Sequence, residues 1–326
     1  MTKRERVLAA LARQPVDRPP VSFWRHVPEI DHDAHRLAEA MLAFHERWDL
    51  DFIKVMSSGV YCVEDWGCQV AYLGSPGGAK QCTRHAVNSI DDWAAIKPLD
   101  PETGALGREL EVVRRIAAGR RDDAPILHTI FSPLTIARKL AGERVNDDLR
   151  AHPDTVGPAL EAITRTVERY AAAALDAGAD GLFVATQAAT PEAFTEAESS
   201  RFDTPGLRRI LQRVGPRSVF TLLHVHGKDI YFDQLATLPA HAINWHERVT
   251  RPSLSEAKRR VAGAVAGGLA EWSTLRRGSA AAITAEVEDA IRQTDGVGLI
   301  VAPGCVLPLE VPDENLAAVV AAVSSR

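Results

Sequence analysis

Short apolar runs alternate with amphipathic segments along almost the whole chain, and this alternation constrains the fold more than any other feature. Runs that are apolar on both faces are typical of buried strands in parallel sheets. They lie near residues 21–24, 51–56, 125–131, 182–186, 220–226, 242–247, 261–269 and 298–305. Between them, apolar residues recur with helical spacing, most clearly over 33–48, 105–119, 154–176, 205–214, 282–294 and 313–324. Eight such units predict an α/β fold, a single (β/α)8 TIM barrel over residues 1–326.

A doubly wound open sheet is the alternative architecture. It is disfavoured because the sequence lacks the glycine fingerprint expected after the first strand of such a sheet. Residues 3–13 predict a short amphipathic helix before the first strand, which gives the barrel an N-terminal helical extension. Residues 57–104 interrupt the strand–helix rhythm with three cysteines and the loop sequence Gly74-Ser-Pro-Gly-Gly78. We interpret this stretch as a loop and hairpin insertion over one mouth of the barrel.

Composition narrows the class of protein. The net charge is −5 and no basic stripe occurs, which argues against nucleic acid as the partner. Four scattered cysteines favour a reduced, cytoplasmic protein over a disulfide scaffold. The N-terminal residues lack the apolar core of a signal peptide. No run approaches the about 20 apolar residues of a membrane helix, so we expect no membrane association.

Histidines close two successive strands. His224 and His226 end the 220–226 strand, and His246 ends the next one. Because side chains alternate along a strand, His224 and His226 point to the same face. Cys305 closes the last apolar run. Barrel active sites lie at the carboxyl ends of the strands, so we expect these four residues to face one site. Imidazole and thiolate bind metals, although buried histidines that serve packing or bind an organic substrate remain the alternative.

Other polar residues at strand ends complete the predicted site. Lys54 would lie in the barrel mouth, where burial lowers its pKa and where it can bind an anion; pairing with Asp49 or Asp51 is the alternative. We assign catalytic roles to Lys54 and His246, the latter as a metal ligand, an acid–base group or a residue that orients another ligand. The residues expected to contact substrate are Arg25, His26, Ser57, Thr186, Gln187 and Trp245.

Several segments resemble the uroporphyrinogen decarboxylase family, in an order that covers nearly the whole chain. The opening Arg4-Glu-Arg-Val-Leu and the following Pro15-Val-Asp-Arg-Pro-Pro-Val are similar to the start of family members. Ser132-Pro-Leu-Thr-Ile-Ala is similar to the family's Gly-Pro-Phe-Thr-Leu-Ala segment, and Ala302-Pro-Gly-Cys-Val-Leu-Pro also fits. The resemblance implies a single (β/α)8 barrel.

Two departures distinguish the chain from true uroporphyrinogen decarboxylases. Those enzymes carry Arg-Gln-Ala-Gly-Arg-Tyr after the first strand, whereas this chain has Trp24-Arg25-His26 and one arginine. They also place an aspartate after the second strand to hold pyrrole N–H groups. Here Lys54 lies in that segment, and its ammonium would repel those dipoles. Decarboxylation of a tetrapyrrole or another carboxylate is the alternative activity, and a non-catalytic tetrapyrrole- or corrinoid-binding barrel is the second alternative.

The chain is more similar to the zinc-dependent branch of the family, which moves methyl groups between methylcobalamin and coenzyme M. That branch holds zinc through His-x-Cys and a Pro-Gly-Cys cysteine, and this chain has His224-Val-His226 and Pro303-Gly-Cys305 in those places. The resemblance implies zinc at His224, His226 and Cys305, a corrinoid or corrinoid protein as methyl partner, a small thiol or related nucleophile as substrate, and a homodimer. A histidine in place of the middle cysteine leaves the metal more positive, so a different acceptor, or hydrolytic or lyase chemistry, stays open.

Overall fold

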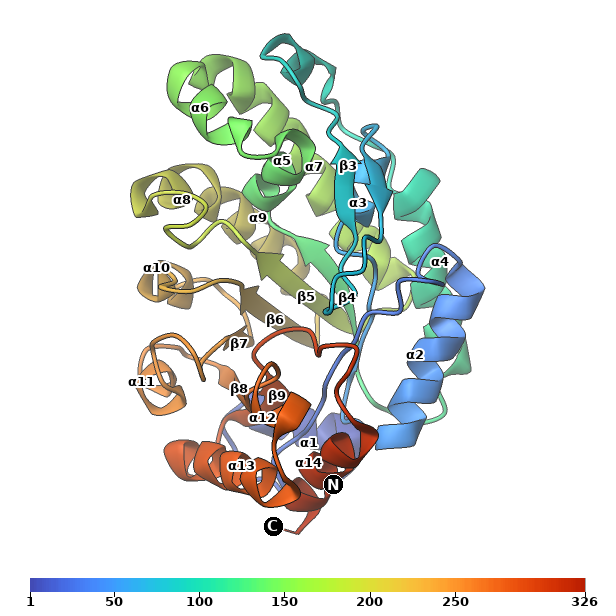
Figure 1. The fold of residues 1–326 in the computed structure, drawn as a ribbon, viewed down its shortest axis with the longest axis vertical. Helices are drawn as coiled ribbons and strands as arrows, with labels where there is room; N and C mark the ends of the chain where they lie inside the picture. Colours follow the sequence, from blue (N-terminus) through green and yellow to red (C-terminus); the bar gives the residue numbers. More distant parts are fainter. Residues whose placement is uncertain (326) are drawn as a thin grey trace.

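Seven parallel strands form a curled sheet at the centre of the computed structural model, which describes residues 1–325 (Figure 1). The sheet order is β1-β4-β5-β6-β7-β8-β9, so neighbouring strands follow one another along the chain. The strands are β1 (Ile53–Lys54), β4 (Ile126–Phe131), β5 (Gly181–Thr186), β6 (Phe220–Val225), β7 (Ala242–Trp245), β8 (Ala264–Leu269) and β9 (Leu299–Pro303).

Residues 20–24 close the sheet between β9 and β1. Val21 pairs in parallel with Val301, and the amide of Ser22 donates to the Val301 carbonyl at 3.1 Å. On the other side, the amide of Asp51 donates to the Val21 carbonyl at 2.9 Å. The segment takes the eighth position, which confirms the predicted (β/α)8 barrel. It forms an isolated bridge instead of the predicted strand, because the preceding Pro19 and Pro20 have no N–H groups to extend a ladder.

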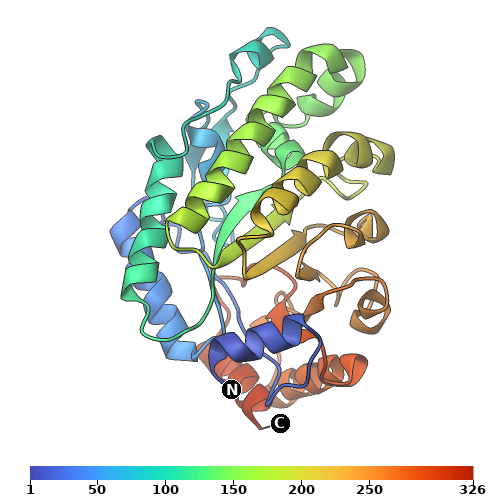
Figure 2. The ribbon, with the colours of Figure 1, turned by 180° about the vertical axis from the view of Figure 1, so that it is seen from behind.

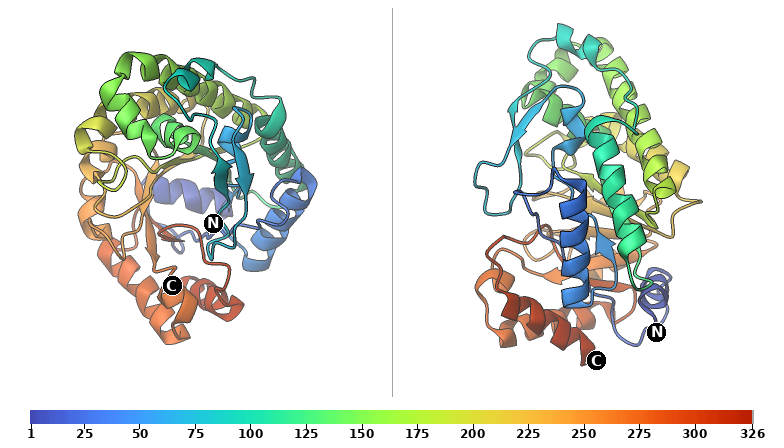
Figure 3. Two further views of the ribbon diagram at one scale, coloured as in Figure 1. Left: turned by 45° about the horizontal axis from the view of Figure 1, so that its top comes forward. Right: turned by 90° about the vertical axis from the view of Figure 1, so that its right-hand side faces the viewer.

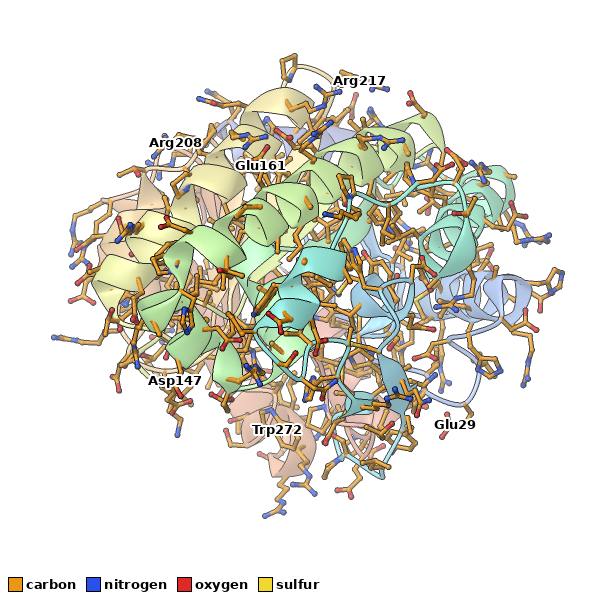
Figure 4. All side chains as sticks on the ribbon, turned by 90° about the horizontal axis from the view of Figure 1, so that it is seen from above. Glu29, Asp147, Glu161, Arg208, Arg217 and Trp272 are labelled. Carbon is orange, nitrogen blue, oxygen red and sulfur yellow. The ribbon has the colours of Figure 1, made fainter. Side chains whose placement is uncertain are left out.

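Helices surround the strands on the outside (Figure 3, left). The larger ones are α2 (Ala34–Trp48), α4 (Gly104–Gly119), α5 (Pro133–Ala141), α7 (Pro153–Asp176), α9 (Thr204–Val214), α13 (Ala280–Thr294) and α14 (Asp313–Ser324). Shorter helices are α6 (Arg144–Ala151), α8 (Glu196–Phe202), α10 (Phe232–Ala236), α11 (Leu254–Lys258) and α12 (Thr274–Arg277). Charged side chains cover the outer helices, as Figure 4 shows for Glu161 on α7 and Arg208 on α9. No helix within residues 1–325 is long and apolar enough to cross a membrane.

Helix α1 (Lys3–Leu11) lies across the amino-terminal end of the barrel (Figure 2). Its arginines bind residues that come just before strands: Arg6 binds Asp51 before β1 at 2.6 Å, and Arg4 binds Asp180 before β5 at 2.7 Å. Arg13, just past the helix, donates to the Gly263 carbonyl before β8 at 2.9 Å. The N-terminal extension therefore covers one end of the barrel and leaves the carboxyl end for a site.

The chain after β1 forms a hairpin at that carboxyl end. It contains α3 (Tyr61–Glu64), the antiparallel strands β2 (Gln69–Ala71) and β3 (Gln81–Arg84), and the 3-10 helix η1 (Asp91–Ala95). The β2–β3 loop projects from the body of the molecule (Figure 3, right). The amide of Leu309, in the loop after β9, donates to the Pro76 carbonyl at 2.9 Å. The ion pair between Lys80 and Asp31 is a second link from this hairpin to the barrel.

Candidate active site

A cavity of about 250 Å³ opens at the carboxyl end of the barrel. Every predicted metal ligand and both predicted catalytic residues line it. The β2–β3 loop contributes Ser75, Gly77 and Lys80 to its wall. The residues at or near strand ends that line it are Trp24, His26, Lys54, Met56, Ser57, Gln187, His224, His226, His246 and Cys305. The cavity therefore joins most of the strand-end residues selected from the sequence.

Four potential metal donors converge on one wall of the cavity. One ligand atom from each of His224, His226, His246 and Cys305 lies within 4.8 Å of the others. The Cys305 Sγ is 3.6 Å from His224 Nε2 and 3.6 Å from His226 Nδ1. His246 Nε2 is 3.3 Å from His226 Nδ1. Strands β6, β7 and β9 deliver these groups, so residues 81 positions apart meet at one point.

Asn244, on β7, fixes the orientation of His224. Its Nδ2 donates both hydrogens, to the Ala266 and Pro303 carbonyls at 3.0 Å each. Its Oδ1 is therefore an acceptor, and it lies 2.6 Å from His224 Nδ1. The proton of the neutral imidazole sits on Nδ1, which leaves the lone pair of Nε2 toward Cys305. A buried amide thus sets the tautomer that a metal ligand needs.

Glu271 performs the same task for His246. Its Oε1 is 3.0 Å from His246 Nδ1, and its Oε2 accepts the Gly304 amide at 3.1 Å. The carboxylate therefore holds both the imidazole and the turn that presents Cys305. Such carboxylate–histidine pairs orient imidazole ligands in metal sites. Glu247, two residues after β7, instead accepts the Gly268 amide at 2.6 Å.

The donor set fits a zinc ion in both type and protonation. Burial alone would raise the pKa of the Cys305 thiol, but the three histidines around it lower that pKa well below its ordinary value. Burial also lowers the pKa of His224, which keeps this imidazole neutral. Thiolate and neutral imidazole are the forms that bind metal. Although burial opposes it, contact with Cys305 and Glu271 raises the pKa of His246 to about 10, so His246 carries the proton that balances the thiolate. A divalent cation would take over that role.

Lys54 is a buried ammonium group in an aromatic environment. Its Nζ lies 4.3 Å from the ring centroid of Phe183 and 5.7 Å from that of Trp24, and 2.9 Å from Met56 Sδ. Burial lowers the pKa of Lys54 to about 7. The alternative pairing with Asp49 or Asp51 is wrong, because these carboxylates bind other cations: Lys3 binds Asp49, while Arg6 and Arg18 bind Asp51.

His26 and Ser57 also line the cavity, together with Gln187. Burial is the main cause that lowers the pKa of His26 to about 3, so its imidazole is neutral. Within residues 1–325, the buried His26 Nδ1 has no hydrogen-bond partner. A neutral imidazole with a free nitrogen can bind a polar group of a substrate.

Three residues predicted to contact substrate lie elsewhere, and those predictions are corrected. Arg25 packs its guanidinium 5.6 Å from the Phe44 ring centroid, on the outer side of the 20–24 segment. The Thr186 hydroxyl donates to Asp203 at 2.9 Å behind β5. Trp245 is fully buried and donates to the Pro252 carbonyl at 3.0 Å. Each comes from a strand position adjacent to an inward-facing one, so its side chain points toward the helices.

Sequence reasoning missed several residues of the cavity wall. Lys139 comes from α5, and Phe183 from the interior of β5. Trp272, 47% exposed, lies at the rim on the loop after β8 (Figure 4). Asn244 and Glu271 hold the ligands from behind. A search limited to residues at strand ends does not find Lys139, because this residue lies on a helix. The sequence signal that could have indicated it was a lysine within an apolar helix next to the barrel mouth.

Enzymes built on closed parallel barrels have their reactive side chains at the carboxyl ends of the strands. This chain has the same arrangement. The chain matches the family model described as uroporphyrinogen decarboxylase (URO-D) over residues 2–326, and it belongs to that family. The predicted family membership is therefore confirmed.

Relatives that match nearly the whole chain are methyltransferases. The chain is 24% identical over 335 residues to the methylcobamide:CoM methyltransferase MtbA of Methanosarcina mazei. This match covers 97% of this chain and 95% of the relative. The chain is 24% identical over 343 residues to MtaA of Methanosarcina barkeri, with 98% and 97% covered. A solved methyltransferase from Methanosarcina mazei superposes with a TM-score of 0.87 at 25% identity, over 100% of this chain and 99% of that one. The protein is an enzyme, as predicted.

Proposed function

We propose that this protein transfers a methyl group between a corrinoid and a small thiol or related nucleophile, with zinc bound by His224, His226 and Cys305. The convergence of three imidazoles and one thiol on a single point carries the proposal. Similarity to methylcobamide:CoM methyltransferases over nearly the whole chain supports the corrinoid as methyl partner. When bound, zinc would lower the pKa of a coordinated thiol and hold it as a nucleophilic thiolate.

The dimensions of the cavity favour a small acceptor. Its volume of about 250 Å³ lies below the roughly 300–1,000 Å³ of ordinary ligand pockets. A small nucleophile fits beside His226 and Cys305, whereas a corrinoid must lie across the mouth of the barrel. Decarboxylation of a porphyrinogen is not favoured, because a tetrapyrrole exceeds this volume and no arginine of residues 1–325 lines the cavity to bind its carboxylates.

Lys54 is proposed to bind an anionic group of the acceptor. Its ammonium lines the cavity and, within residues 1–325, has no carboxylate in ion-pair contact. An unpaired buried charge is costly, and an anion from the substrate offsets that cost. The aromatic walls of Phe183 and Trp24 confine the ammonium to this side of the cavity.

His246 is proposed to take up the proton that the acceptor loses. Its Nδ1 is held by Glu271, so Nε2 is the atom that faces the other donors and can accept the proton. The Glu271 carboxylate stabilises the imidazolium that results. This assigns three metal-binding residues and one proton-accepting residue to the four-donor cluster, which agrees with the open position that catalytic zinc sites keep.

The proposed function also implies a methyl partner, while two predictions from the sequence stay untested. The methyl partner would be a corrinoid at the barrel mouth, either free or held by a corrinoid protein. The cytoplasmic location and the homodimer remain predictions from the sequence.

Zinc content tests the metal site directly. We expect about one zinc per wild-type chain after dialysis and almost none in the His224→Ala/His226→Ala double variant. His35→Ala is the matched control, because His35 is an exposed histidine on α2 that forms only an ion pair with Glu39. Equal zinc in the double variant and the wild type would contradict the site.

Methyl transfer tests the activity and the role of His246. Zinc-loaded protein is mixed with methylcobalamin and a panel of small thiols, and loss of the methylated corrinoid is followed by its absorbance. We expect His246→Gln to keep zinc but to lose roughly 10²-fold or more in rate, the range of a general base. Loss of zinc from His246→Gln would instead identify His246 as a ligand. No turnover with any thiol would contradict the proposed reaction.

A further inference from the structure

Two cysteines outside the candidate metal site donate to the same backbone oxygen. Cys82 lies in β3 and Cys68 just before β2, and their Sγ atoms are 3.4 Å and 3.8 Å from the Lys139 carbonyl oxygen. Lys139 belongs to the last turn of α5, where carbonyls have no partner within the helix. The two thiols are also close enough for each to shift the pKa of the other. The hairpin thus holds both sulfur atoms against one point of α5.

We propose that Cys68 and Cys82 form a reversible disulfide and make this hairpin a site of redox modification. The two thiols differ in access. Cys82 is partly exposed and lines a second cavity of about 400 Å³, beside the first, that small reagents can enter. Cys68 is buried, with 7% of its surface exposed. A reagent therefore meets Cys82 first, and Cys68 is the thiol that resolves the product.

The environments of the two sulfurs agree with this order. Contact with the Cys68 thiol is the main cause that lowers the pKa of Cys82 to about 7; burial opposes this shift, and His85 and Lys139 assist it. The same contact is the main cause that raises the pKa of Cys68. A thiol whose pKa is near the ambient pH is the better attacking group in disulfide exchange. Cys62, also in this insertion, is fully buried, and burial raises its pKa to about 12.

The chemistry is an exchange with a small disulfide such as oxidised glutathione. The Cys82 thiolate attacks one glutathione sulfur, forms a mixed disulfide and releases glutathione thiolate, which takes up a proton. The Cys68 thiol then gives its proton to solvent and attacks the Cys82 sulfur, and the second glutathione thiolate leaves. Two protein thiols are oxidised and one glutathione disulfide is reduced to two thiols.

The modification would reach the candidate active site through Lys139. The Lys139 side chain lines both the second cavity and the cavity that contains the metal donors. A disulfide removes the S–H donors of Cys68 and Cys82 from the Lys139 carbonyl. When Cys82 is ionised, the disulfide also removes its negative charge, which favours the Lys139 ammonium. The proposal stands on the hairpin alone and does not depend on the proposed methyl transfer.

The test treats zinc-loaded full-length protein with oxidised glutathione and measures the intact mass. We expect wild type to lose the mass of two hydrogens without retaining glutathione. The Cys68→Ser variant should instead keep one glutathione on Cys82, and Cys82→Ser should react at least ~10-fold more slowly, because the remaining Cys68 thiol is protonated. Cys62→Ser is the matched control and should behave like wild type.

Peptide mapping locates the bond. Cleavage after Lys80 and Arg84 isolates Cys82 on Gln81–Arg84, and cleavage after Glu64 separates Cys62 from Cys68. The expected product links Gln81–Arg84 to the peptide with Cys68. A linkage to Cys62, or a wild-type mixed disulfide as persistent as that of Cys68→Ser, would overturn the proposal. Native mass and far-UV circular dichroism of each variant before treatment exclude misfolding as the cause.

Discussion

The amide of Asn244 determines which nitrogen of His224 carries a proton. Replacement of Asn244 by alanine removes the acceptor of His224 Nδ1 and frees the ring to rotate or change tautomer. We expect Asn244→Ala to bind zinc roughly 10–100-fold more weakly, the usual effect of losing such a partner. Competition with a chromophoric chelator measures the affinity.

Asn315 provides the matched control for this prediction. It is another buried asparagine, and its Nδ2 donates to the Leu275 carbonyl at 2.8 Å, outside the candidate site. Asn315→Ala should lower the free energy of unfolding, as Asn244→Ala does, yet leave the zinc affinity unchanged. Equal zinc affinities for Asn244→Ala and wild type would refute the positioning role.

Lys54 should oppose folding stability at neutral pH. Its pKa falls from 10.5 in the unfolded chain to about 7 in the folded protein, mainly through burial. Between these values the unfolded chain binds more protons, so the free energy of unfolding rises with pH through this window, by up to about 1.4 kcal/mol per pH unit. Lys54→Met, which lacks the charge, should be more stable than wild type at pH 7, and the difference should shrink toward pH 10.

Denaturant titrations at pH 7, 8.5 and 10 check this prediction for Lys54. Lys97→Met, at an exposed position, is the control and should show no such pH dependence relative to wild type. The same Lys54→Met variant should lose affinity for an anionic acceptor. A stability difference that stays constant with pH would show that Lys54 is not a buried titrating group.

Sequence alone predicted the residues whose role follows from strand periodicity. His224, His226 and Cys305 were placed on one site because each ends a strand, and the structure brings them together. Asn244 and Glu271 could not be selected in this way, since their roles depend on which atoms of neighbouring strands they reach. The prediction for Trp245 was wrong for a related reason: a shift of one position along β7 turns a side chain from the cavity toward the helix layer.

The β2–β3 loop contacts the barrel through a glycine that has no space for a side chain. Gly78 has φ of +76°, and a Cβ there would lie 2.8 Å from His26 Cβ and 3.0 Å from Leu309 Cδ2. Gly78→Ala should therefore separate the loop from the barrel. We expect faster hydrogen exchange at the Leu309 amide, which donates to Pro76, and a loss of about 2–4 kcal/mol from overlap and backbone strain together.

Gly74→Ala, in the same loop, is the control that separates backbone strain from the loss of the Gly78 contact. The φ of Gly74 is +80°, but a Cβ there meets nothing within 4 Å. Gly74→Ala therefore introduces backbone strain alone, about 1–2 kcal/mol. If both variants show the same exchange rate at Leu309, the Gly78 contact does not hold the loop.

Elements with long apolar periodicity were predicted well, whereas some of the short helices were missed. The predicted helix at 154–176 is α7, observed as Pro153–Asp176. Helices α6 and α12 were missed because eight and four residues are too few to show a period. Helix α8 was missed although Thr195 and Glu198 form a capping box, a start signal that a search for apolar spacing ignores.

The whole barrel depends on a buried carboxylate that closes its seam. Asp51 is fully buried, accepts the Val21 amide at 2.7 Å and binds Arg6 and Arg18 at 2.6 Å each. Asp51→Ala leaves the half-buried Arg18 guanidinium without its carboxylate and removes the buried one of the two carboxylates that bind Arg6. It should cost about 3–5 kcal/mol in the free energy of unfolding. Denaturant titration measures this loss.

Asp17 is the control for the seam. It also binds Arg6, at 2.7 Å, but its side chain is 40% exposed. Asp17→Ala should cost about 1 kcal/mol or less, as exposed pairs do. Equal losses for Asp17→Ala and Asp51→Ala would show that closure of the barrel does not depend on the buried carboxylate.

The topology followed from the repeated strand–helix units, whereas closure of the barrel depended on particular contacts. Eight units predicted the architecture, but the weak first strand joins the sheet through hydrogen bonds of Ser22 and Asp51 that no periodicity encodes. The insertion of residues 57–104 was recognised because it breaks the strand–helix rhythm. Its hydrogen bond to Leu309 was not predicted, because Leu309 lies far away in the sequence.

If the proposed zinc site is correct, the two hydrogen bonds from the Asn244 amide make zinc affinity a reporter of strand alignment. Asn244 pairs with Ala266 in the β7–β8 register and also reaches Pro303 on β9. A slip of one residue between any of these strands would remove an acceptor, let the amide turn over and present an N–H group to His224. Refolded preparations can therefore be sorted by chelator resistance: molecules with a misaligned barrel would keep their helices and yet release zinc readily.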